Sequence, residues 1–151
     1  MKKVGVLMGS ASDLPVVQKA VDVLARFDIP YEVHIYSAHR TPEQARDFAV
    51  NARKKGYGVL IAAAGMAAHL PGVIAASTTV PVIGVPISAS MMGMDALLAI
   101  VQMPPGIPVA TVGVDAAMNA GLLAVQMLAV GDEALKTALA EYKESLKAKI
   151  T

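Results

Sequence analysis

The sequence predicts a three-layer α/β/α sandwich in which helices cover both faces of a five-stranded parallel sheet. Short apolar runs of strand length alternate along the chain with segments whose apolar residues repeat at helical spacing. Turns rich in small or polar residues separate the two kinds of segment. Strands that alternate with helices form parallel sheets through right-handed crossovers. Because no linker-like segment interrupts the pattern, a single domain is expected over residues 1–151.

The first predicted strands and helices occupy residues 4–64. Residues 4–8 form an apolar strand, and the helix that follows can be capped by Ser12 or Asp13, with Pro15 in its first turn. Residues 31–36 alternate apolar and polar, which predicts a strand with two different faces and a solvated His34 on the polar one. A helical stripe at positions 45, 48, 49 and 52 ends at Gly56, and residues 59–64 form the third strand.

The remaining elements continue the alternation. A turn over residues 65–71 leads into a short helix to about residue 77, and the fourth strand, residues 82–85, is flanked by prolines. Asp95 opens a helix to about residue 103, the fifth strand is expected over 109–114, and two helices follow over about 116–130 and 133–149. The terminal helix has one apolar face, which either packs on its own domain or reaches a neighbouring subunit. A flavodoxin-like strand order is the best expectation for this arrangement.

Composition excludes several classes of protein. The 13 Lys and Arg balance 12 Asp and Glu without a basic stripe, so no nucleic-acid partner is expected. The absence of cysteine removes disulfides and thiolate chemistry and is compatible with the cytoplasmic location that we expect. No metal-ligand spacing and no convincing membrane span occur. Few charges lie between residues 56 and 131 of a chain that is 55% hydrophobic, which favours a homo-oligomer.

The turn after the first strand is typical of an anion site. Gly9-Ser10-Ala11-Ser12-Asp13 places two hydroxyls at a helix N-terminus, where free N–H groups favour negative charge. It lacks the glycines and lysine of dinucleotide and triphosphate loops. Asp13 would repel phosphate but accept hydrogen bonds from a sugar, so a nucleoside monophosphate is indicated. The alternative is that Ser12 and Asp13 only cap the helix.

The turn after the second strand carries the groups most suited to chemistry. Ser37-Ala38-His39-Arg40-Thr41-Pro42 combines a proton carrier, an anion-binding guanidinium and two hydroxyls. In open α/β folds such turns lie above the carboxyl edge of the sheet, where ligands bind. A solvated loop with a charged capping turn is an equally good interpretation of the hexapeptide alone.

The turn after the third strand is built of small residues. Gly65-Met66-Ala67-Ala68-His69-Leu70-Pro71-Gly72 allows close approach to the backbone and can contain a small neutral molecule. A lone histidine among apolar residues is more often structural than catalytic, and His69 alone does not decide between the two. In a flavodoxin-like sheet this turn and the one at Gly9 flank the same crevice.

Five segments together resemble the class I PurE family of N5-carboxyaminoimidazole ribonucleotide mutases. They are the three turns above together with Pro81-Val82-x-Gly84-Val85-Pro86 and Gln102-Met103-Pro104-x-Gly106-Ile107-Pro108-Val109, in the same order along nearly the whole chain. The resemblance implies a flavodoxin-like subunit, a homo-octamer and no cofactor. It also implies an isomerase of purine (IMP) biosynthesis that moves a carboxylate from the exocyclic nitrogen of the ribonucleotide to C4 through carbon dioxide.

The resemblance assigns roles to individual residues. His39 becomes the general acid and base, and the turn at Gly65 holds carbon dioxide. Asp13 contacts the ribose, and His69 supports the base side of the pocket. The remaining predicted phosphate-binding and pocket residues are Ser10, Ser12, Ser37, Arg40, Gly65, Ala67 and Leu70.

The chain departs from the family pattern at Met66, where a second glycine is common, at Pro105, where arginine is common, and at residues 115–119. Three alternatives stay open. A class II relative would carboxylate aminoimidazole ribonucleotide directly, but usually has lysine at the position of Arg40. A carboxylating domain of pyridinium-cofactor synthesis normally follows an extra N-terminal region. A non-enzymatic nucleotide-binding module would bind ligand without an essential histidine.

Overall fold

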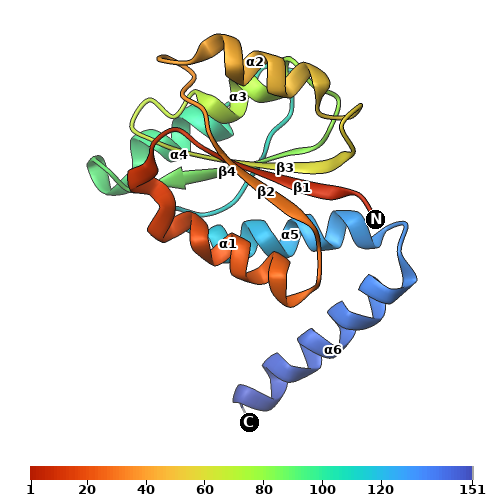
Figure 1. Cartoon of the computed structure of the whole chain (residues 1–151). Helices are drawn as coiled ribbons and strands as arrows, with labels where there is room; N and C mark the ends of the chain where they lie inside the picture. The colour runs from red at the N-terminus through yellow and green to blue at the C-terminus, as the bar shows by residue number, and fades with distance from the viewer. Residues whose placement is uncertain (151) are drawn as a thin grey trace.

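The computed structural model describes residues 1–150 and confirms the predicted flavodoxin-like architecture (Figure 1). Its strands are β1 (Lys3–Met8), β2 (Tyr31–Ile35), β3 (Tyr57–Gly65), β4 (Val82–Ile87) and β5 (Ala110–Thr111). All adjacent strands are parallel, in the order β2-β1-β3-β4-β5. The helices are α1 (Leu14–Arg26), α2 (Pro42–Asn51), α3 (Leu70–Ala76), α4 (Met94–Val101), α5 (Ala117–Ala129) and α6 (Glu133–Ile150), with short 3-10 turns η1 (Ala11–Asp13) and η2 (Met91–Gly93).

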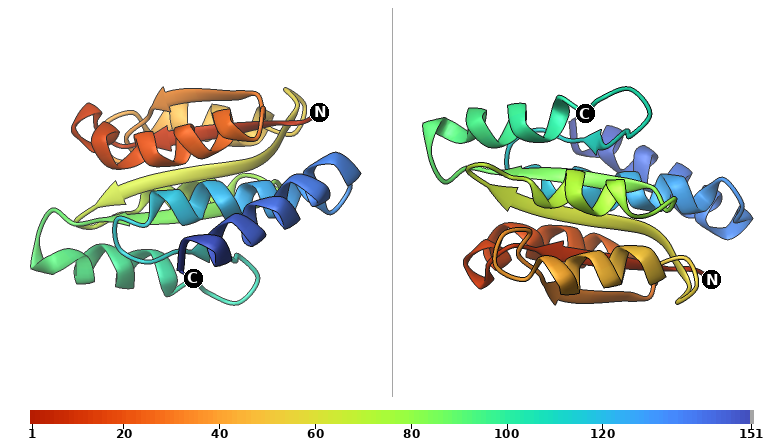
Figure 2. Two further views of the ribbon diagram at one scale, coloured as in Figure 1. Left: turned by 90° about the horizontal axis from the view of Figure 1, so that it is seen from below. Right: turned by 90° about the horizontal axis from the view of Figure 1, so that it is seen from above.

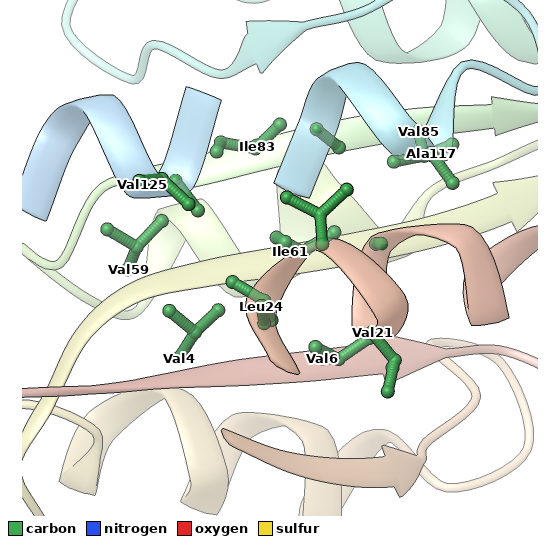
Figure 3. Packing of buried hydrophobic residues seen from close by; sticks show 14 of the residues in the cluster. Val4, Val6, Val21, Leu24, Val59, Ile61, Ile83, Val85, Ala117 and Val125 are labelled. Atoms are coloured by element: carbon green, nitrogen blue, oxygen red, sulfur yellow. The ribbon is translucent and has the colours of Figure 1, made fainter. Parts of the chain in front are cut away.

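The sheet separates two apolar cores. Helices α2, α3 and α4 cover one face, whereas α1 and α5 cover the other (Figures 1 and 2). Figure 3 shows Val4, Val6, Val59 and Ile61 of the sheet packing against Leu24 and other residues of α1 and α5. Side chains alternate between faces along a strand, so Leu7 lies in the opposite core.

Helix α6 packs on its own domain through its first half. Leu135 is buried, and the Tyr142 ring lies edge-on to Phe27 at 5.9 Å between ring centroids. The guanidinium of Arg26 lies over the same ring. Further along, Leu146 is 39% exposed. No helix within residues 1–150 is both long and apolar enough to cross a membrane.

The prediction for β2 was wrong about which face is buried. Tyr31, Val33 and Ile35 are exposed, whereas His34 is half-buried and stacks on Tyr36 with ring centroids 5.4 Å apart. Strand β2 lies at the edge of the sheet, and Phe48 of α2 covers the face that carries His34. The face that carries the three apolar side chains is therefore left uncovered. The His34 Nε2 atom lies 3.4 Å from a Glu32 carboxylate oxygen rather than in solvent.

Two strand boundaries differ from the prediction. Strand β4 continues through Pro86, since its pairing with β3 extends to Gly65 and Ile87, and the proline carbonyl still accepts the N–H of Asp115 at 2.8 Å. Strand β5 has only two residues instead of the six expected. The chain leaves the sheet edge so that Asp115, with φ of 58°, can also accept the Ser88 N–H.

The cap of the first helical segment also differs. Ser10 lies at the N-cap of η1, and its hydroxyl accepts the N–H of Ser12 at 3.3 Å. Asp13 occupies the N-cap position of α1 without a side-chain capping bond. The inserted 3-10 turn moves the capping function back to Ser10, which leaves the carboxylate of Asp13 available for another partner.

Candidate active site

A pocket of about 470 Å³ lies at the carboxyl edge of the sheet and is lined by all three predicted turns. Every site residue predicted from the sequence contributes to its wall. These residues are Ser10, Ser12, Asp13, Ser37, His39, Arg40, Gly65, Ala67, His69 and Leu70. The parallel register brings them together because the carboxyl ends of β1, β2 and β3 lie at one edge (Figure 1).

The turn after β1 presents two hydroxyls and a carboxylate. The Ser10 and Ser12 hydroxyl oxygens are 2.9 Å apart, so a hydrogen bond between the two side chains fixes their relative position. Burial raises the pKa of the Asp13 carboxyl, although a hydrogen bond with the Ser10 backbone works in the opposite direction. A partly desolvated carboxylate gains from hydrogen-bond donors that a ligand brings, such as sugar hydroxyls.

The turn after β2 is ordered by its own hydrogen bonds. The Ser37 hydroxyl oxygen accepts the N–H of His39 at 3.3 Å and of Arg40 at 3.0 Å. Thr41 closes the turn, since its hydroxyl oxygen accepts the Ser37 N–H at 2.8 Å. The backbone that carries the imidazole and the guanidinium is therefore held in place, unlike that of a solvated connecting loop.

The turn after β3 forms the small-residue wall. Met66 and Ala68 have φ of 55° and 40°, and the Ala68 N–H closes the turn on the Gly65 carbonyl at 2.9 Å. A Cβ added to Gly65 would approach the Ala89 Cβ to 3.2 Å and the Ile87 carbonyl to 3.3 Å. Glycine therefore keeps this wall close to the end of β4. Met66 is 60% exposed and lies among the lining residues.

Two features of the pocket were not predicted from the sequence. The first is Ala89, which lines the pocket from the segment after β4 and could have been found because β4 neighbours β3 in a flavodoxin-like sheet. The second is a direct contact between the two histidines: His39 Nε2 lies 2.8 Å from His69 Nδ1. No local sequence signal links these residues, which are 30 positions apart.

The fold and pocket define an α/β protein whose sheet-edge pocket places hydroxyl, carboxylate and guanidinium groups beside an imidazole pair. A family model described as AIR carboxylase matches residues 3–149. The chain belongs to this AIR carboxylase family.

Relatives in the family carry two kinds of name. The N5-carboxyaminoimidazole ribonucleotide mutase of Pyrococcus abyssi is 55% identical over 97% of this chain and 85% of its own length. The N5-carboxyaminoimidazole ribonucleotide mutase of Methanocaldococcus jannaschii is 52% identical over 96% of this chain and 90% of its own. The chloroplastic phosphoribosylaminoimidazole carboxylase of Vigna aconitifolia is 54% identical over 95% of this chain but only 26% of its own length.

The fold is similar to that of solved relatives. The crystal structure of Treponema denticola PurE superposes with a TM-score of 0.86, covering 97% of this chain and 92% of the other at 30% identity.

Proposed function

We propose that the chain is an N5-carboxyaminoimidazole ribonucleotide mutase of purine biosynthesis, an isomerase that forms 4-carboxy-5-aminoimidazole ribonucleotide. The observation that carries the proposal is the pocket itself, in which His39 lies between polar anion-binding turns and a wall of small residues. Relatives about half identical over nearly the whole chain bear the mutase name, which supports the same reaction here.

The substrate has three parts that need different partners, and the pocket offers each of them. The hydroxyls of Ser10, Ser12 and Ser37 and the Arg40 guanidinium would bind the phosphate. Asp13 would accept hydrogen bonds from the ribose. The backbone and methyl groups of residues 65–68 would enclose the carboxyl group as it leaves, so that carbon dioxide stays near the ring.

In the proposed mechanism His39 acts twice, first as a general acid and then as a general base. As an imidazolium it protonates the carbamate nitrogen, and the N–C bond breaks to release carbon dioxide and aminoimidazole ribonucleotide. The ring carbon C4 then attacks carbon dioxide and forms the new C–C bond. Neutral His39 removes the C4 proton, which restores aromaticity and returns the imidazolium for the next turnover.

Direct carboxylation of aminoimidazole ribonucleotide is the second candidate. The observation that favours it is the carboxylase name of the Vigna relative, which is 54% identical to the chain. The same pocket could perform this reaction, because aminoimidazole ribonucleotide and carbon dioxide are the intermediates of the mutase mechanism. The two candidates differ only in which substrate enters.

The deciding experiment supplies the purified protein with one of two substrate sets. One assay contains N5-carboxyaminoimidazole ribonucleotide, and the other contains aminoimidazole ribonucleotide with bicarbonate. We expect rapid formation of the C4-carboxylated product from the first set and slow formation from the second. Efficient turnover of the second set alone would reject the mutase and support the carboxylase.

We also propose that the subunits assemble into a homo-octamer. Segment η2 and helix α4 carry apolar side chains that are between 45% and 86% exposed. These are Met91, Met92, Met94, Leu98 and Val101. Adjacent apolar exposure of this kind is typical of a surface that a partner covers. Since η2 begins two residues after the lining residue Ala89, a subunit packed there would also lie beside the pocket.

Assembly can be tested by light scattering coupled to size-exclusion chromatography. We expect a mass of eight 15.6 kDa chains at micromolar concentration. Met92→Glu, which places a charge on the 86% exposed side chain, should lower the mass, whereas the control Lys19→Glu, at an exposed position of α1, should not. A wild-type mass equal to that of one chain would contradict the octamer.

A further inference from the structure

The contact between the two histidines restricts where protons can lie in the pocket. His39 Nε2 and His69 Nδ1 are 2.8 Å apart, with ring centroids 4.9 Å apart and ring planes inclined at 70°. Two ring nitrogens 2.8 Å apart form a hydrogen bond, and only one proton lies between them. Two N–H groups could not face each other at this distance. One histidine must therefore donate while the other presents a bare nitrogen.

The direction of this hydrogen bond follows from the acid role of His39. When His39 is an imidazolium, both of its ring nitrogens carry protons, so Nε2 must donate. His69 Nδ1 must then be bare, and neutral His69 carries its proton on Nε2. If His69 instead donated from Nδ1, each protonation of His39 would break the contact.

We propose that His69 is a positioning residue that keeps a proton on His39 Nε2. The Nδ1 atom of His39 is thereby left for the substrate. This inference rests on the proposed function. His39 Nδ1 makes no hydrogen bond to any group in residues 1–150, which leaves it available. The location of His69, at the start of α3 in the turn that forms the small-residue wall, aims its Nδ1 across the pocket at His39.

In the reaction, His39 Nδ1 then both gives the first proton and takes the second. The imidazolium gives the Nδ1 proton to the carbamate nitrogen and becomes neutral, with its Nε2 proton still donated to His69. After the new C–C bond forms, the C4 proton moves to the bare Nδ1, which restores the imidazolium. His69 neither gains nor loses a proton during the cycle, so its part is to hold the His39 ring and tautomer.

Two other ionisable side chains also face the pocket. Asp13 comes from the turn after β1, and Arg40 follows His39 in the same turn. The third histidine of the chain, His34, stacks on Tyr36 and Phe48 and does not line the pocket. It therefore provides an internal reference for spectroscopy and a control for mutagenesis.

The tautomers can be read from the octamer or any smaller assembly by magic-angle-spinning NMR of protein labelled with ¹³C,¹⁵N-histidine. Only three histidines contribute signals, and His34→Gln, His39→Asn and His69→Asn assign them. At a pH where the imidazoles are neutral, we expect a proton on Nε2 of both His39 and His69. A proton on Nδ1 of His69 would overturn the inference whether or not the protein has mutase activity.

Two substitutions of His69 separate positioning from mere packing. In His69→Asn the amide oxygen lies near the former Nδ1 and can accept the His39 proton, so kcat/KM should stay within about threefold of wild type. In His69→Leu this acceptor is lost, so kcat/KM should fall about tenfold or more, with mixed His39 tautomers. The control His34→Gln should leave both measurements unchanged.

The outcomes are distinguishable from failure of the proposed function. Wild-type protein that uses neither substrate set rejects the mutase and carboxylase, and the tautomer measurement alone then decides the inference. If the wild type is active, equal kcat/KM values for His69→Leu and wild type overturn the positioning role. Equal losses of kcat/KM in His69→Asn and His69→Leu also overturn the positioning role, because the asparagine amide should restore the hydrogen bond and with it the activity.

Discussion

Replacing His39 with asparagine is expected to lower kcat by at least about 10²-fold, the range typical for loss of a general acid and base. Asparagine has a similar reach but can neither give a proton to the carbamate nitrogen nor take one from C4. The groups proposed to bind phosphate and ribose are unchanged, and the backbone N–H of residue 39 can still donate to the Ser37 hydroxyl. Ribonucleotide affinity, measured by calorimetry, should therefore change little.

The matched control for this experiment is His34→Gln. His34 lies outside the pocket and packs on Tyr36 and Phe48, so its replacement tests for a general effect of losing a histidine. Thermal unfolding of both variants checks that the fold survives. Wild-type turnover in His39→Asn would sink the acid–base mechanism, and a parallel loss of nucleotide binding would mean that His39 acts in binding instead.

Gly84→Ala is expected to destabilise the fold by about 1–3 kcal/mol, because β4 has no room for a methyl group at this position. An added Cβ would lie 2.4 Å from the Ile100 side chain and 3.0 Å from that of Val109. Ile100 is fully buried, so it cannot move out of the way without disturbing the core between the sheet and α4. The thermal midpoint should fall by at least about 3 °C.

Gly131→Ala is the matched control, since a Cβ there meets no atom within 4 Å. Gly131 lies in the turn between α5 and α6, and its replacement should change the midpoint by less than about 1 °C. An unchanged midpoint in Gly84→Ala would show that Ile100 and Val109 can repack. Both variants keep every residue of the pocket, so assays of the folded proteins should give similar kcat values.

Much of the fold could be predicted because its central strands are continuous apolar runs between turns of small or polar residues. Strands β1 and β3, buried on both faces, lie within one or two residues of their predicted bounds at each end. Predictions failed at the sheet margins. The edge strand β2 exposes its apolar face, and β5 is short because Asp115 turns back toward the end of β4. The exposed face of β2 and the end of β5 depend on which elements pack beside them, and the local periodicity of the sequence carries no information on that packing.

The candidate site was predictable in its membership but not in its internal arrangement. Each lining turn follows a predicted strand, and parallel strands end at one edge, so the expected flavodoxin-like order brings the three turns together. The hydrogen bonds inside the turns could not be predicted in the same way. Ser10, not Ser12 or Asp13, caps the first helical segment, because a 3-10 turn precedes α1.

The sequence alone determined the alternation of strands and helices, the three turns that follow the first three strands and the chemical groups those turns carry. These follow from local patterns of burial and from the residue types themselves. Only the tertiary structure decided that His39 and His69 share a hydrogen bond. That contact depends on the relative positions of two turns 30 residues apart, which the pairing of β1 with β2 and β3 sets. Periodicity can identify neighbouring turns, whereas a hydrogen bond between their side chains requires the positions of atoms.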